Sequence, residues 1–255
     1  MSRERNEVFA VGGTPQVDIG VSSEDVLILH GSTSEIGVRI EGSGADDFAL
    51  TQAGDTVLIT APRGRRLLSG SGRLTVTVPK KTAVDIRTAS GDVHIKAGVT
   101  RLDVATASGD IRAGDVHGDV RVRSASGDCL FGNIDGSFDV ATASGDIRAG
   151  TVRGSVSIAS ASGDVRLAAV EGLATFKTAS GDLAVDMFDG PTFDMKTMSG
   201  DATLGIPRRR RLELDLQLLA GGLRNRLPES DGSKPEKTIA IRAIGMSGDL
   251  TLRGA

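Results

Sequence analysis

Apolar and polar residues alternate along much of the chain, in short segments that recur at a fixed interval. In Val84–Thr88 apolar residues alternate with charged ones, and the pattern returns 18 residues later in Leu102–Thr106. Alternation with period two predicts a β-strand with one buried face. The inward positions form two apolar columns: Val84, Leu102, Val120, Phe138, Val156, Ala174 and Phe193, and Ile86, Val104, Val122, Val140, Ile158, Phe176 and Met195.

Each of these predicted strands is followed by the tripeptide Ser-Gly-Asp. Six copies follow one another at steps of 18 residues, a seventh comes after 19, and an eighth stands near the end of the sequence. A fixed period of this kind is the sequence signature of a stacked solenoid. The repeated residues are Ser90, Gly91, Asp92, Ser108, Gly109, Asp110, Ser126, Gly127, Asp128, Ser144, Gly145, Asp146, Ser162, Gly163, Asp164, Ser180, Gly181, Asp182, Ser199, Gly200, Asp201, Ser247, Gly248 and Asp249.

Two further apolar columns follow the tripeptide, and a glycine then marks another corner. These positions are Val93, Ile111, Cys129, Ile147, Val165, Leu183 and Ala202; Val116, Ile134, Val152, Val170 and Phe188; and Gly118, Gly136, Gly154, Gly172 and Gly190. We therefore predict an all-β fold, a single-stranded right-handed parallel β-helix (β-solenoid) with 18 residues per coil and coils about 4.8 Å apart. The last apolar column favours three sides over the alternative of two flat sides.

The residue types of the motif suit a sharp corner. Glycine supplies a positive φ, while Ser and Asp side chains bond backbone N–H groups that a turn leaves unpaired. The stacked aspartates would repel one another by about 1 kcal/mol per pair in water, so hydrogen bonds, nearby cations or Arg112, Arg148 and Arg166 must offset that charge. Hydroxyl side chains are expected to point inward and bond the backbone at Thr88, Thr106, Ser124, Thr142, Ser160 and Thr178.

Calcium is the alternative explanation for the aspartate ladder. Calcium-binding β-rolls also repeat with a glycine- and aspartate-rich turn, but they carry one in every nonapeptide. This chain has one Gly-Asp per coil and no partner carboxylate at the opposite corner, whereas Ca²⁺ takes six to eight oxygen ligands. We therefore expect turn chemistry, with calcium a disfavoured partner, and assign no catalytic, cofactor-binding or metal-binding residue.

The pattern decays on both sides of the regular coils, and Ser23–Asp25 resembles a degenerate Ser-Gly-Asp corner. Arg63–Arg66 and Pro207–Arg211 are expected to be solvated basic loops, and Ala220–Gly222 is expected to occupy a corner. The predicted segments are 1–79, an N-terminal β cap with degenerate first coils; 80–206, the regular coils; and 207–255, irregular C-terminal coils with a polar loop at 228–238.

Composition excludes several functional classes. The formal net charge of −3 over 255 residues provides no field that attracts nucleic acid. Aromatic residues make up 3% of the chain, with no Trp or Tyr, which argues against base-stacking or sugar-stacking platforms. His94 and His117 occupy different coil positions, so they predict no dyad, and Cys129 in an apolar column is expected to be a buried hydrophobe.

The beginning of the sequence lacks the apolar core of a signal peptide, and no stretch reaches transmembrane length. We therefore expect a cytoplasmic protein.

Two runs carry a family resemblance. Arg73–Pro79 (RLTVTVP), followed by Ile86–Asp92 (IRTASGD), resembles the bacterial putative-adhesin β-strand-repeat family, domain of unknown function 4097. The resemblance extends to the closing run Ser247–Arg253 (SGDLTLR). The family is itself similar to the toastrack domains of envelope-stress proteins. It implies a β-repeat fold and a role in assembly or sensing, and it supplies no catalytic residues.

These observations favour a non-catalytic scaffold whose regular faces bind a protein partner or a second copy of the chain. The alternative is a polysaccharide-binding or polysaccharide-cleaving β-helix, which needs clustered acids and bases in a cleft made by long loops. Loops within 80–200 are short, and a ladder of equivalent aspartates singles out no acid and no base. An ice-binding solenoid would need outward hydroxyls, whereas the alternation places them inward. We therefore expect no enzymatic activity.

Overall fold

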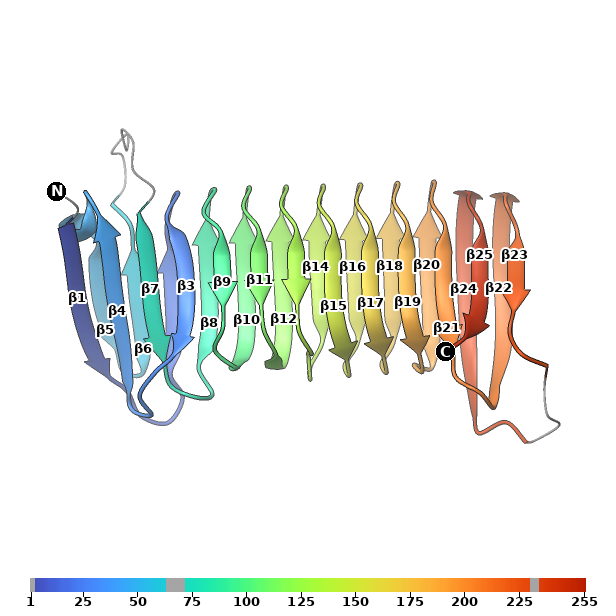
Figure 1. Ribbon diagram of the computed structural model, residues 1–255, viewed down its shortest axis with the longest axis horizontal. Coiled ribbons are helices and arrows are strands. Elements are labelled where there is room, and N and C mark those ends of the chain that lie inside the picture. Colours follow the sequence, from blue (N-terminus) through green and yellow to red (C-terminus); the bar gives the residue numbers. More distant parts are fainter. Residues whose placement is uncertain (1–2, 63–71, 230–233) are drawn as a thin grey trace. The chain divides into compact units, whose positions relative to one another are not determined.

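A computed structural model describes residues 3–62, 72–229 and 234–255, and the chain divides into two compact units, Met1–Leu130 and Phe131–Ala255. Regular structure in the described residues is β, as predicted, apart from one 3-10 turn (Figure 1). The basic segment Arg63–Arg66 and residues 230–233 of the predicted polar loop lie outside the described residues.

Unit 1 holds the N-terminal strands and the 3-10 turn. They are β1 (Arg3–Ala10), β2 (Gln16–Gly20), β3 (Asp25–His30), β4 (Glu35–Gly42), η1 (Ala45–Asp47), β5 (Ala49–Ala53), β6 (Thr56–Thr60), β7 (Arg73–Val78), β8 (Ala83–Thr88), β9 (Val93–Ile95), β10 (Val99–Thr106), β11 (Ile111–Ala113), β12 (Val116–Ser124) and β13 (Cys129–Phe131). One sheet has the order β1-β4-β7-β3-β9-β11-β13 and the other β12-β10-β8-β2-β6-β5. The β1–β4, β4–β7 and β5–β6 pairs are antiparallel, whereas β2–β8, β8–β10 and β10–β12 are parallel.

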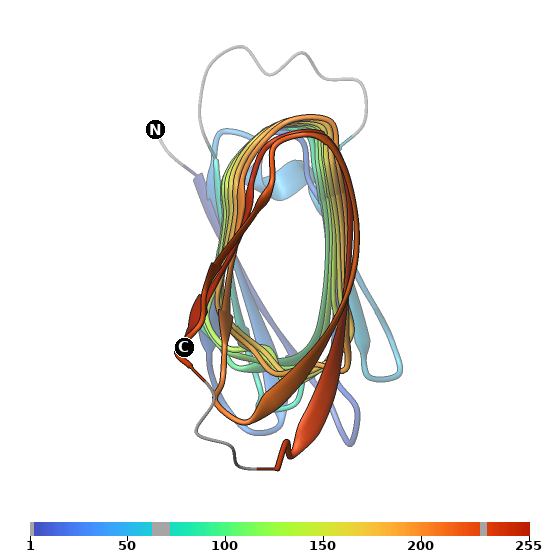
Figure 2. The ribbon, with the colours of Figure 1, turned by 90° about the vertical axis from the view of Figure 1, so that its right-hand side faces the viewer.

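Unit 2 is built from parallel pairs. Its strands are β14 (Phe138–Thr142), β15 (Ile147–Val152), β16 (Val156–Ser160), β17 (Val165–Val170), β18 (Ala174–Thr178), β19 (Leu183–Phe188), β20 (Thr192–Thr197), β21 (Ala202–Ile206), β22 (Arg210–Ala220), β23 (Leu223–Arg226), β24 (Lys237–Ser247) and β25 (Leu250–Gly254). One sheet has the order β15-β17-β19-β21-β25-β23 and the other β22-β24-β20-β18-β16-β14. The two sheets face each other across the apolar columns (Figure 2). Strand β24 begins inside the predicted polar loop 228–238.

The strands of each unit form two sheets, so the expectation of three sheet-forming sides is not met. In unit 2 the column after the corner and the last apolar column share one strand, as Val165 and Val170 do in β17. The arrangement therefore follows the two-sided alternative and is that expected of a β-solenoid. Neighbouring strands keep equivalent residues opposite each other, for example Val156 and Ala174. The right-handed sense and the overall coil size stay predictions.

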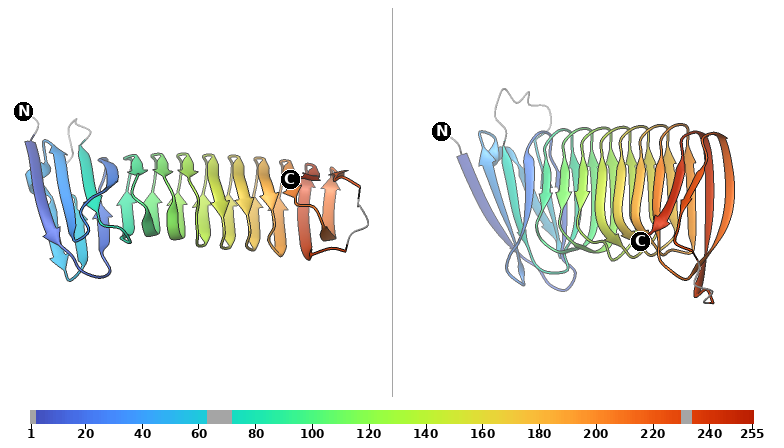
Figure 3. Two further views of the ribbon diagram at one scale, coloured as in Figure 1. Left: turned by 60° about the horizontal axis from the view of Figure 1, so that its bottom comes forward. Right: turned by 45° about the vertical axis from the view of Figure 1, so that its right-hand side comes forward.

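At both ends of the chain the order of coils in space departs from their order in sequence. In unit 1 the β2–β3 coil lies between β8–β9 and β6–β7. In unit 2 the β24–β25 coil lies between β20–β21 and β22–β23, which Figures 1 and 3 show at the C-terminal end. As a result β22 and β23 are the terminal strands at one end of unit 2. The sequence pattern did not predict this order.

The apolar columns identified from the sequence form the core of each unit. Every member of the four columns is less than 9% exposed, and most are almost completely buried. In unit 2 Phe188 and Phe193 stack edge to face, with ring centroids 5.4 Å apart, and Phe193 also contacts Phe176. A core filled in this way leaves the coils no hollow interior for a ligand.

Candidate functional site

The strongest candidate site in the sequence is the Ser-Gly-Asp ladder, and its glycines are fixed by backbone geometry. Gly109, Gly127, Gly145, Gly163, Gly181, Gly200 and Gly248 have φ between 114° and 124°, which side-chain-bearing residues rarely adopt. A Cβ at Gly163 would also clash with the carbonyl oxygen of Gly145 in the adjacent coil. Gly91 is different, because it lacks a positive φ and is required by its close approach to the Glu24 backbone.

The aspartates of the ladder bind the backbone of the next coil. In unit 1 the Oδ1 atoms of Asp25, Asp92 and Asp110 accept the N–H groups of Asp92, Asp110 and Asp128, at 3.1, 2.9 and 3.0 Å. In unit 2 the same relay runs from Asp146 through Asp164, Asp182, Asp201 and Asp249 to the N–H of Gly222, at 2.8–3.1 Å. Each carboxylate therefore satisfies a backbone donor that the corner would otherwise leave unpaired.

Hydroxyl groups on the inner side satisfy the corner carbonyls. Thr106, Ser124, Thr142, Ser160, Thr178 and Thr197 each donate to the carbonyl of the Ser two residues later, at 2.8–2.9 Å. Thr88 instead accepts the N–H of Gly91 at 3.2 Å. The serines of the motif bond mainly through their backbone, as Ser162 N–H does to Ala143 O at 3.0 Å.

Arginine side chains neutralise part of the ladder. Arg112 pairs with Asp110 at 2.7 Å and Arg148 with Asp146 at 2.8 Å, as expected, and Arg224 pairs with Asp249 at the last corner. Arg166 was expected to do the same, but it is exposed and forms no ion pair in the structure of residues 131–229 and 234–255. Nor do the described residues bring three His, Cys, Asp or Glu side chains together in a way that could hold a metal ion.

The other candidates from the sequence lie apart from one another. His94 is on β9 and His117 on β12, which belong to different sheets. Cys129 is 2% exposed, and its burial raises the pKa of the thiol to about 12. A thiol that stays protonated at neutral pH is a poor nucleophile, so Cys129 acts as a core residue.

One polar cluster was missed by the sequence analysis. Arg210 belongs to the run expected to be a solvated loop, yet its side chain is only 14% exposed. Its Nε donates to Asp189 Oδ1 at 2.8 Å, its Nη1 donates to Glu236 at 3.0 Å, and Lys237 donates to the Asp189 carbonyl. The hydrogen bond from Arg210 holds the pKa of Asp189 below its usual value. Because this cluster joins three segments that are distant in sequence, no local sequence pattern predicts it.

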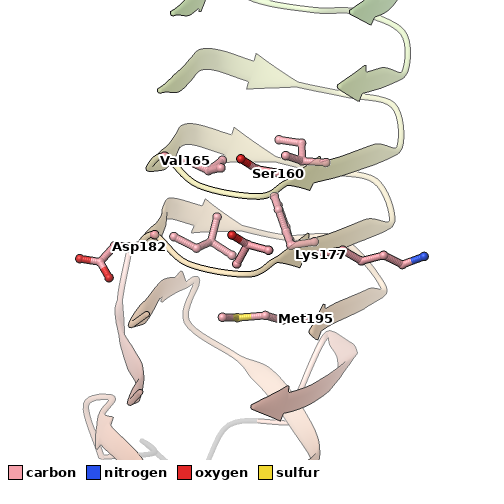
Figure 4. Close-up of a pocket in the computed structure, with 11 residues that line it drawn as sticks. Ser160, Val165, Lys177, Asp182 and Met195 are labelled. Atoms are coloured by element: carbon pink, nitrogen blue, oxygen red, sulfur yellow. The ribbon is translucent and has the colours of Figure 1, made fainter. Parts of the chain in front are cut away.

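One interior void within the regular coils of unit 2 is too small to hold a ligand. A void of about 10 Å³, lined by Ile158, Ser160, Phe176 and Met195 among others, has room for at most one water molecule. Figure 4 shows Ser160, Val165 and Met195 at this void, while Asp182 and Lys177 point away to the outside. This void therefore provides no ligand site.

Comparison with known proteins identifies the family. Residues 15–253 match the family model described as Toastrack DUF4097, and no curated protein matches the chain. Similar solved structures include a putative adhesin from Bacteroides fragilis, 14% identical over 98% of this chain and 97% of that one, with a TM-score of 0.46. A putative adhesin from Parabacteroides distasonis is 10% identical over 98% and 97%, with a TM-score of 0.43. A putative cell adhesion protein from Clostridium sporogenes is 9% identical over 99% and 100%, with a TM-score of 0.28. Because the family model covers most of its length, this chain belongs to the toastrack DUF4097 family.

Proposed function

We propose that this chain is a non-catalytic, adhesin-like interaction module that binds protein through the outer faces of its sheets. The observation that carries the proposal is the use of the repeated polar groups. Ladder carboxylates such as those of Asp146 and Asp164 accept a backbone N–H of the neighbouring coil, and several ladder carboxylates also pair with arginine. These contacts give the repeated groups a structural role in holding the coils together, and their uniform arrangement singles out no acid, base or nucleophile.

The surface of unit 2 supports recognition by an extended face. Arg148 and Arg166 lie side by side on the outer face of one sheet, and Lys177 and Lys196 do so on the other. All four side chains are exposed. Ladders of like side chains on a regular sheet suit a partner that contacts several coils at once, as expected for a repeat protein.

The alternative, a polysaccharide-binding or polysaccharide-cleaving protein, needs a cleft with differentiated acids. Glycoside cleavage requires two carboxyl groups in different environments, whereas the ladder aspartates in the described coils share one arrangement. The family and the adhesin descriptions of similar structures favour the interaction role. We extend the proposal to surface assembly or envelope stress, the setting that the toastrack resemblance implies.

The cellular location is part of the proposal. None of the helical structure in the described residues is long and apolar enough to span a membrane. The cytoplasmic expectation is tested by fractionating the cells that make the protein and locating the full chain by immunoblot.

Cross-linking tests the interaction module. The full chain is cross-linked in extracts of the cells that make it, beside an Arg148→Glu/Arg166→Glu variant and a Lys177→Glu/Lys196→Glu variant with the same change in charge. A specific partner is expected to be lost with one variant and kept with the other. Equal capture by all three proteins would contradict face-specific recognition, and release of reducing ends from polygalacturonate would favour the polysaccharide alternative.

A further inference from the structure

The end coil of unit 2 exposes two edge strands. Within residues 131–229 and 234–255, strand β22 pairs only with β24 and is the last strand of its sheet, while β23 pairs only with β25 and is the last strand of the other. Unpaired backbone groups along an edge are a template for another strand. Residues of β22 span 11 positions, which makes this edge longer than natural proteins usually leave open.

The interior of the end coil is covered on one side only. Leu214 lies opposite Ile241, yet Leu214 is 42% exposed while Ile241 is 1% exposed. Leu223 on β23 is 39% exposed. The leucines of β22 therefore form an apolar layer that lacks a second covering layer.

An apolar ridge runs to this end along the corner. The residue before Ser is alanine in six regular coils, but the last coils carry Met198, Met246 and, opposite Met246, Leu219. These three side chains are 58%, 54% and 83% exposed. Large exposed side chains gathered at one place on a protein mark interaction surfaces.

The terminal strand of unit 1 is protected by contrast. On β1 the side chains of Arg5 and Glu7 lie on the face that packs toward the core, opposite Ile40 and Val38. Arg5 donates to Glu7 at 2.8 Å and to the carbonyl of Phe48, beside η1, at 2.7 Å. Inward charges on an edge strand oppose strand addition, whereas on β22 the inward positions 212, 214, 216 and 218, which follow Arg210, are all leucines.

We propose that the end coil β22–β23 binds the same coil of a second copy of this chain, about a two-fold axis. The proposal goes beyond the proposed function, because it uses the edge strands of the end coil and not the outer faces of the sheets, and it names a second copy as the partner. A second copy offers what a single peptide strand cannot, namely two edges at the same spacing with a leucine layer between them. A two-fold axis parallel to the strands places β22 antiparallel to β23 of the copy and closes both edges at once.

Charge complementarity supports this pairing. The outward side chains of β22 include Glu213 and Asp215, and those of β23 are Arg224 and Arg226. Across the sheet Asp194, Arg242 and Asp215 alternate in sign from strand to strand. The row ends on Asp215, which pairs with Arg242 at 3.1 Å and stays 55% exposed. A basic strand from the copy continues this alternation, whereas β22 against β22 would bring carboxylates together in several registers.

The test is sedimentation of the purified full chain over a concentration series. We expect a mass that levels off at twice the 26.3 kDa of one chain. Leu214→Lys should abolish the dimer, because a charge would enter the apolar layer. Val8→Lys is the matched control, since Val8 is 65% exposed on the edge strand β1, and it should leave the dimer intact. Arg226→Glu, an exposed substitution with little risk to folding, should weaken association at least about tenfold through like-charge repulsion.

Circular dichroism and thermal melting of each variant show that folding is retained. A monomer at all concentrations would overturn the inference, as would a dimer that survives both Leu214→Lys and Arg226→Glu. A mass that keeps rising would indicate open-ended stacking and overturn the two-fold interface. Capture of a different protein by the cross-linking experiment, with a monomeric chain, would leave the proposed function standing and remove only the second copy as partner.

Discussion

At the residue scale, glycine and aspartate meet two different structural requirements of the corner. Glycine allows neighbouring corners to approach closely, and aspartate ties them together through a backbone N–H. Gly222 stands where the other coils have Asp, in the coil at the end of the stack, and its N–H donates to Asp249. An aspartate is needed only where a further coil of the chain supplies an N–H to accept.

Gly163→Ala should destabilise unit 2 by about 2–4 kcal/mol, from the strained φ and the clash with Gly145 together. The control is Gly13→Ala, because a Cβ there would meet no atom within 4 Å, and it should change stability by less than about 0.5 kcal/mol. Urea unfolding followed by circular dichroism measures both. Equal stability of the two variants would refute the role of the corner glycine.

Asp164→Ala should cost about 1–3 kcal/mol, because the N–H of Asp182 would lose its acceptor. Asp164→Asn keeps an Oδ1 acceptor and removes a charge from the ladder, so its effect should be small. The same urea titration compares the two variants. If Asn were as damaging as Ala, the charge itself would be what stabilises the corner.

At the scale of elements, the Arg210 cluster holds the start of β22 across β24 to the turn before β20. Arg210 reaches Asp189 and Glu236, and Lys237 at the start of β24 bonds the same turn. This cluster explains how an end strand with no fully buried side chain stays in register.

Arg210→Ala should speed hydrogen exchange of the β22 and β23 amides by about tenfold or more, since charged hydrogen bonds contribute about 1.5–3 kcal/mol before solvent screening. Arg211→Ala, at the exposed neighbouring position, should leave exchange unchanged.

The pKa of Asp189 is lowered in the folded state from 3.8. The stabilisation is therefore complete above the unfolded-state pKa and is lost as pH falls through the folded-state value. The difference between Arg210→Ala and the parent chain should thus disappear in strong acid; a constant difference would contradict it.

At the scale of the whole molecule, hydrogen bonds and ion pairs within the chain contact the repeated carboxylates. The relay hydrogen bonds, together with the arginine pairs at some of the corners, offset part of the charge of the ladder in the described residues. We expect the melting temperature to be the same within about 1 °C in EGTA and in millimolar calcium, because a bound ion would stabilise the folded state by mass action. Scanning calorimetry measures this, with magnesium as the control for ionic strength. A rise of several degrees with calcium alone would revive the cation ladder.

Local sequence patterns were enough to predict the strands, the inward columns and the corners. These features are local: alternation sets which face is buried, and the repeated tripeptide sets where the chain bends. The residue pattern also indicated the degenerate corner at Ser23–Asp25. In the structure Asp25 keeps the acceptor role of the ladder aspartates, because its Oδ1 accepts the N–H of Asp92. The sequence also has Gly222 where the other coils have Asp. That this replacement marks the coil at the end of the stack became clear only from the order of the coils in the structure.

Tertiary structure alone decided how the sides combine into two sheets, which coils lie at the ends, and which polar groups meet there. An alternating strand such as β22 fits equally well against any neighbour with the same pattern, so its own residues do not choose between a place inside the stack and a place at its edge. The Arg210–Asp189 pair depends on that choice, because it joins segments 21 residues apart across another strand. The same choice leaves Leu214 half-covered, and the surface proposed for a second copy exists only because long-range pairing placed β24 and β25 beneath it.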